Sequence, residues 1–172
     1  DEEEKSLGTR RLLSEGAGYN GAVVGEPTSL NLCLGHRGLE WFEVRFFGKT
    51  VHGGSQEEGK NAISMARAFM NRVDACLLPA ILSRRNSLLG SSTMNYGLIS
   101  GGTQPSTVAG YCILRFDRRW VPGEKYDEII AEYREILAEL KKEDPEFNAE
   151  IRVMEESFME SGVYHEALVT SA

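Results

Sequence analysis

Positive charge is scarce in this chain of 172 residues. Lys and Arg number 19 against 26 Asp and Glu, so the net charge is −7 at neutral pH. Nucleic acids and anionic membrane surfaces bind proteins through a basic footprint, which this composition does not supply. Long apolar runs are also lacking, and none approaches the roughly 20 residues of a membrane-spanning helix. We therefore expect neither a nucleic acid nor a membrane as partner.

Cysteine is sparse as well. Cys33, Cys76 and Cys112 are an odd number, lie far apart and form no CxxC pair. This pattern excludes a disulfide framework and a thiolate metal site. Each cysteine lies in an apolar stretch, as buried free thiols do, and we expect a reducing, cytoplasmic compartment.

What is present is the composition of a soluble globular protein, with 41% hydrophobic and 26% charged residues. The pattern changes near residue 30, and we divide the chain into residues 1–29, 30–155 and 156–172. In the first part, the apolar run Ala22–Val24 is followed by Gly25 and Glu26. This predicts a buried strand with Glu26 at its carboxyl end, where ligands gather in α/β sheets.

The long middle part combines strand and helix patterns. Phe42, Val44 and Phe46 alternate with Glu43 and Arg45, which is typical of a strand with one wet face. The expected elements are two strands within 30–49, a helix over 61–73, strands over 91–102 and 107–120, a helix between Pro122 and Pro145, and a strand over 149–156. This order predicts an α+β fold: an antiparallel sheet with two helices on one face.

The chain opens with four carboxylates, and such a run is usually a solvated tail. A second interpretation is chemical. Of two adjacent carboxylates such as Glu2 and Glu3, one can bind a cation while the other moves a proton, and Glu26 could add a further oxygen ligand.

Two further candidate site residues have side chains that bind through nitrogen atoms, a histidine and an arginine. His52 lies in GKTVHGG, where glycines let the backbone approach a ligand closely and leave the imidazole accessible; the alternative is a turn histidine with no task. Arg115, Asp117 and Arg119 alternate along one expected strand. An Arg held there can capture a carboxylate, but a surface ion-pair ladder explains the same pattern.

Seven motifs in order carry a family resemblance: DEEEKSLGT, VVGEPT, HRG, GKTVHGG, GKNAI, GGTQPSTV and FDRRWVPGE. From residue 1 to about 124 the chain resembles the co-catalytic zinc amidohydrolases, which include acetylornithine deacetylase, succinyl-diaminopimelate desuccinylase, aminoacylase and carboxypeptidase G. The resemblance implies that residues 30–155 are the lid, or dimerisation, domain of such an enzyme. Residues 1–29 and 156–172 would then be short pieces of its α/β catalytic domain.

The resemblance also implies a role for each candidate. Glu2 matches the general base, and Glu3 and Glu26 match carboxylate ligands of two divalent metal ions, zinc or alternatively cobalt or manganese. His52 matches a lid histidine that reaches across a homodimer to stabilise an oxyanion. Arg119 matches the arginine that holds the substrate carboxylate. Ser106 stands where relatives often carry an Asn that lines the substrate pocket.

The imidazole ligands of that metal site have no counterpart in this chain. We therefore expect an internal fragment that is inactive and metal-free by itself. Its parent would hydrolyse the amide of an N-acyl amino acid or small peptide through a metal-activated water. The alternative is a non-catalytic association module with a solvated acidic surface, which pairs through an exposed edge of its sheet.

Overall fold

A computed structural model describes residues 7–16, 18, 29, 31 and 35–154. Near the start of the chain, helix α1 (Leu7–Ser14) buries none of its residues. Most of the expected 1–29 segment and all of 156–172 lie outside the described residues, as does the expected strand at 22–24. The layer described below is formed by residues 35–154.

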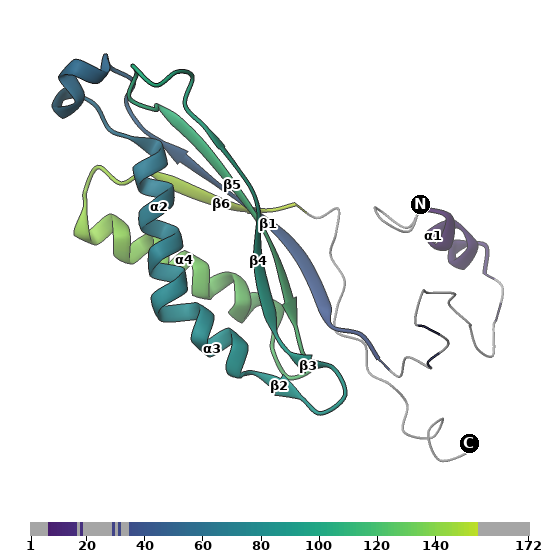
Figure 1. Ribbon diagram of the computed structural model, residues 1–172. Coiled ribbons are helices and arrows are strands. Elements are labelled where there is room, and N and C mark those ends of the chain that lie inside the picture. The colour runs from purple at the N-terminus through teal and green to yellow at the C-terminus, as the bar shows by residue number, and fades with distance from the viewer. Residues whose placement is uncertain (1–6, 17, 19–28, 30, 32–34, 155–172) are drawn as a thin grey trace.

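The centre of this layer is a four-stranded antiparallel sheet in the order β4-β5-β1-β6 (Figure 1). The strands are β1 (Gly38–Phe47), β4 (Thr93–Gly101), β5 (Tyr111–Trp120) and β6 (Ala149–Val153). A separate two-stranded hairpin joins β2 (Arg85–Asn86) to β3 (Gly90–Ser91). Helices α2 (Ala62–Arg72), α3 (Leu78–Ser83) and α4 (Tyr126–Glu143) cover one face of the sheet (Figure 1). The α+β prediction is confirmed.

The core lies between this face and the helices. Alternating residues of β1 and β5 point into it, and Phe42, Val44 and Leu114 are fully buried there. The ring of Phe116 packs against Tyr133 of α4 with 4.8 Å between centroids and the ring planes tilted by 50°. The predicted apolar stripe of α4 forms its buried face, made of Ile129, Ile130, Tyr133, Ile136, Leu137 and Leu140. Burial of such a stripe is the main stabilisation available to an amphipathic helix.

The helical stretch that begins with α2 continues beyond the residues that the sequence pattern indicates. Asn61 begins it, because the side-chain Oδ1 accepts hydrogen bonds from Ile63 N and Ser64 N. After α2 the chain continues through a π-helical turn, Val73–Leu77, into α3. Pro79 enters as the second residue of α3, directly after the turn. A proline lacks the N–H that a regular helix needs, and the wider π turn accommodates the change of hydrogen-bond register.

One further expectation needs correction, and one falls largely outside the described residues. Cys76 is exposed on the π-helical turn rather than buried; Cys112 is buried as expected, and Cys33 lies outside the described residues. Residues 30–49 contain one described strand, β1, because the segment expected to form the first strand falls largely outside the described residues. Within the described part of the chain, no helix combines the length and apolar character needed to cross a membrane.

Candidate functional site

His52 lies on an exposed loop at one end of the sheet. It caps a short 3-10 helix, Gly53–Glu58, and its Nδ1 accepts a hydrogen bond of 3.1 Å from Gly54 N. Because Nδ1 is the acceptor, the neutral ring carries its proton on Nε2. The loop therefore holds the imidazole in one orientation, and no hydrogen bond within the described part of the chain occupies its Nε2.

The structure brings His52 and Ser106 together. His52 forms an isolated antiparallel bridge with Thr107. On either side of it, Gly53 N donates to Ser106 O at 2.7 Å and Val108 N donates to Val51 O at 2.9 Å. A Cβ on Gly53 would stand 2.9 Å from Ser106 O, so this position admits only glycine without a shift. The glycine after His52 thus serves the close contact between two loops.

A groove of about 460 Å³ opens beside this pair of loops. Its wall includes Thr107, the bridge partner of His52, together with Asn61 and Ile63 at the start of α2. The rest is the connection after β4, formed by Gly101, Gly102, Thr103, Gln104, Pro105 and Ala109. Asn61, Thr103, Gln104 and Thr107 add polar side chains to this wall, so the groove offers hydrogen-bonding groups to a small ligand.

Arg119 lies at the opposite end of the sheet. It is the penultimate residue of β5, and His52 lies beside residues that precede this strand. The ten residues of β5 span roughly 30 Å at about 3.3 Å per residue. Figure 1 shows the loops that follow β1 and β4 at one end of the sheet and the β2–β3 hairpin at the other. One copy of the chain cannot bring His52 and Arg119 to the same ligand.

On the open face of the sheet, Arg119 is ion-paired rather than free. Its Nε lies 3.1 Å from Asp117 Oδ1, and Trp41 Nε1 donates to Asp117 Oδ2 at 3.2 Å. The Arg119 side chain is 47% exposed, so a substrate carboxylate could reach it. The ladder interpretation of this strand is confirmed at this pair.

The ladder continues across the same face. Glu43 accepts from Arg115 Nε at 2.7 Å and from Arg45 Nε at 2.5 Å. Burial alone would raise the pKa of Glu43, but the hydrogen bonds from Arg115 and then Arg45 outweigh it and lower the pKa. On this solvent-facing side of the sheet, Arg45, Arg115 and Arg119 are therefore each paired with a carboxylate.

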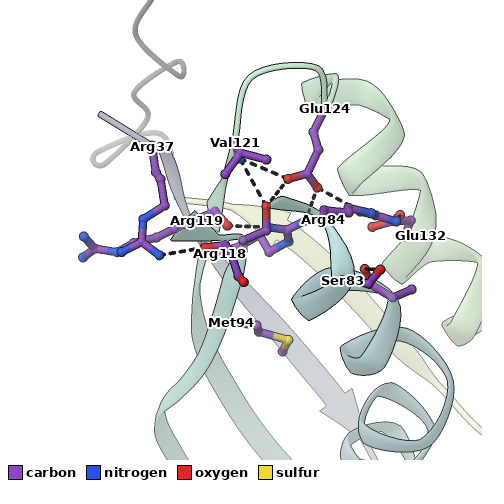
Figure 2. A network of polar contacts seen from close by, with 12 residues as sticks. Arg37, Ser83, Arg84, Met94, Arg118, Arg119, Val121, Glu124 and Glu132 are labelled. Carbon is purple, nitrogen blue, oxygen red and sulfur yellow. Dashed lines mark hydrogen bonds and ion pairs between the residues drawn. The ribbon is translucent and has the colours of Figure 1, made fainter. Parts of the chain in front are cut away.

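A buried polar cluster behind Arg119 was not found by sequence reasoning (Figure 2). Glu124, in the turn after β5, accepts hydrogen bonds from Arg84, Arg118 and Ser92. Arg84 also pairs with Glu132 of α4. The available signal was the apolar alternation of β5, which places Arg118 on the core face, where a charge requires a buried partner.

The metal ligands implied by the resemblance cannot be located. Glu2, Glu3 and Glu26 lie outside the described residues. Among the residues that the structure does describe, no group of three or more His, Cys, Asp or Glu could hold a metal ion. The described part therefore supplies the lid-borne candidates His52, Ser106 and Arg119, and no metal centre.

Known proteins are similar to this chain in sequence and in fold. The acetylornithine deacetylase of Myxococcus xanthus is 30% identical over 157 residues, covering 90% of this chain and 41% of the relative. The acetylornithine deacetylase of Aliivibrio fischeri is 31% identical over 156 residues, covering 84% and 39%. The chain thus spans about two-fifths of the length of these relatives.

Solved structures agree on the fold. An amidase of the hydantoinase/carbamoylase family from Burkholderia phymatum superposes with a TM-score of 0.66 at 18% identity, covering 80% of this chain and 32% of that one. Aminopeptidase PepT from Bacillus cereus gives 0.58 at 20% identity, covering 77% and 32%. The family described as the peptidase dimerisation domain matches residues 34–145, which include the whole sheet except β6. This chain belongs to the peptidase dimerisation domain family.

Proposed function

We propose that this chain forms the lid and dimer interface of a metal-dependent amidohydrolase that removes the acyl group from an N-acyl amino acid or small peptide. The separation of His52 from Arg119 by about 30 Å along β5 carries the proposal. Two groups suited to one amide substrate lie at opposite ends of a domain whose family is named for dimerisation. A second copy of the chain resolves this separation.

The β4 edge of the sheet suits self-association. Leu98 and Ile99 on this edge strand are 45% and 51% exposed, and Ile63 of the neighbouring helix α2 is 43% exposed. The other edge strand, β6, carries Glu150 and Arg152 on the open face of the sheet. Unpaired strand edges with apolar side chains favour strand pairing, whereas charged edges disfavour it. The homodimer we propose pairs β4 with β4 of a second copy.

Antiparallel pairing then places the two groups together. In a two-fold dimer, the Gly101 end of β4 in one copy lies beside the Thr93 end in the other. Thr93 is the register partner of Arg119, and the loop after Gly101 leads to Ser106 and thus to His52. Each composite site would combine His52 and Ser106 of one copy with the partner's Arg119.

The chemistry follows from the side chains. The guanidinium of Arg119 forms two parallel hydrogen bonds with a carboxylate, which orients the substrate. His52 donates from Nε2 to the oxygen of the amide carbonyl as negative charge develops on it, a stabilisation typical of oxyanion sites. Glu2 is the proposed base that takes the proton of the attacking water and returns it to the leaving amine. Two divalent ions, for which Glu3 and Glu26 are proposed ligands, would supply the activation of that water.

The test is complementation in the full-length protein that contains this chain. His52→Ala and Arg119→Met are each expected to abolish most hydrolysis of N-acetyl amino acids while the protein remains dimeric. Mixed and reassorted in equal amounts, they should recover about a quarter of the wild-type activity, because half of the dimers then hold one intact composite site. Two wild-type copies mixed in the same way provide the reference.

Each other outcome identifies a different error. No recovery on mixing would show that each site uses His52 and Arg119 of its own copy, against the geometry of β5. Full activity of both single variants, with the dimer intact, would leave the association module as the function. If either variant lost the dimer, the same mixing experiment would be repeated with a variant elsewhere in the loops beside His52, such as Ser106→Ala.

A further inference from the structure

Arg118 is a charged residue in a position that the strand pattern assigns to the core. It lies on the helix-facing side of β5 with Phe116 and Leu114, and its exposed fraction is 0%. Burial of a charged side chain costs more free energy than burial of an apolar one of similar volume, unless its hydrogen bonds are satisfied. A leucine could fill this position at a lower cost in free energy, so the presence of an arginine needs a specific explanation.

The guanidinium of Arg118 joins two fixed points. One terminal nitrogen, Nη1, donates to the main-chain carbonyl of Arg119, and the other, Nη2, donates to the Glu124 carboxylate (Figure 2). Arg118 thus contacts the backbone of the residue that is proposed to bind the substrate carboxylate. The contact comes from the side of the sheet opposite to the Arg119 side chain.

The Glu124 carboxylate is itself held from several sides. Oε1 accepts from Ser92 Oγ and from Val121 N, the latter at 3.1 Å, and Oε2 accepts from Arg84 Nη1 at 2.9 Å. The side chain is 10% exposed. Burial would raise the pKa of Glu124, but the hydrogen bonds from Ser92 and Arg84 and the charge of Arg118 lower it. The carboxylate is therefore an ionised anchor between the start of β4, the end of α3 and the turn after β5.

We propose that Arg118 is a positioning residue. Anchored by Glu124, it fixes the carbonyl of Arg119 and so the direction in which the Arg119 guanidinium leaves the sheet. This inference rests on the proposed function, because it needs Arg119 to bind the substrate carboxylate. A guanidinium held in one orientation binds a carboxylate with two hydrogen bonds, whereas one free to rotate meets it less often in the required geometry.

The test is Arg118→Leu in the full-length protein that contains this chain. The KM for an N-acetyl amino acid should rise about tenfold while kcat changes by less than about twofold, because the lost interaction orients the ground state and the transition state alike. The KM for the corresponding N-acetyl amino acid amide, which has no carboxylate, should stay unchanged. Should Arg118→Leu fail to fold, Glu124→Gln keeps the side-chain shape, weakens the anchor and is expected to give the same split.

Arg84→Leu is the matched control. It removes the other arginine that donates to Glu124, and this guanidinium donates to Glu132 where Arg118 donates to the Arg119 carbonyl. Both variants should lower the urea midpoint, and only Arg118→Leu should raise the KM for the carboxylate substrate. Equal KM changes in the two variants, or an unchanged KM in Arg118→Leu, would overturn the positioning role.

Arg119→Met separates this inference from the function on which it rests. An unchanged KM for the carboxylate substrate in Arg119→Met would refute the proposed role of Arg119 itself. A raised KM in Arg119→Met together with an unchanged KM in Arg118→Leu would refute only the positioning role of Arg118.

Discussion

The indole of Trp120 lies directly over Gly38. The two residues are register partners at the end of the β1–β5 pair, and a Cβ on Gly38 would stand 2.0 Å from Trp120 Cε2. The glycine of the HRG motif therefore provides room for the ring of Trp120, a residue with an exposed fraction of 2%. This glycine of the motif therefore has a packing role.

Gly38→Ala should destabilise the chain by about 1–3 kcal/mol, because the ring and its neighbours must shift to admit one methyl group. Urea unfolding followed by tryptophan fluorescence measures the difference. Gly97→Ala in β4 is the control, since the nearest atom to its Cβ would be 3.8 Å away. A similar loss in both variants would show that the flexibility of glycine, and not the ring contact, sets the effect.

Removal of the Asn61 side-chain cap should weaken the start of α2. Asn61→Ala leaves Ile63 N and Ser64 N without the side-chain acceptor that binds them at 2.9 and 3.2 Å. The expected loss of unfolding free energy is about 1 kcal/mol. Asn61→Asp retains the acceptor and should restore most of this stability. Thermal unfolding by circular dichroism compares the three proteins.

Stability should fall with acidification through Glu124. Its pKa is lower in the folded chain than in the unfolded one, so this carboxyl contributes stability that is present above its unfolded pKa. The contribution is lost as the pH falls through the lower folded pKa. Between pH 6 and pH 3, the urea midpoint of Glu124→Gln should therefore decline less steeply than that of the unchanged chain. Parallel slopes would contradict the assignment.

The β4 edge should govern self-association. Ile99→Lys places a charge on an edge residue that is 51% exposed, and desolvation of this charge opposes strand pairing. Sedimentation of the full-length protein should shift from dimer toward monomer. Glu150→Lys on the opposite edge strand, β6, changes the charge by two units, against one unit for Ile99→Lys, and should still leave the dimer intact. A dimer lost only with the β6 variant would reverse the proposed edge.

Local patterns predicted much of the layer correctly. The apolar stripe of α4 and the alternation of β5 each depend on neighbours a few residues away, and both occur where expected. The expected helix over 61–73 did not indicate that the helical stretch continues through a π turn into α3, where Pro79 is the second residue. Cys76 lies among apolar residues but faces solvent, because an amphipathic helix exposes one side regardless of composition.

The candidate site was recognisable in its parts but not in its arrangement. The accessible imidazole of His52 and the alternating charges around Arg119 follow from the sequence, and the structure agrees with both. The roles assigned to them, and to Ser106, stay predictions. The alternation of β5 places Arg118 on the core face, but Glu124 looks like an ordinary surface charge in the sequence. Only the turn after β5 brings the two side chains together inside the molecule.

The sequence by itself determined α2, α4, the two-faced strands and the α+β class, because hydrophobic periodicity is a property of consecutive residues. The tertiary structure alone decided that His52 meets Ser106 and lies about 30 Å from Arg119, and that four donors converge on one carboxylate at Glu124. Such meetings depend on strand order and register, which join segments far apart in the chain and leave no trace in the local pattern of residues.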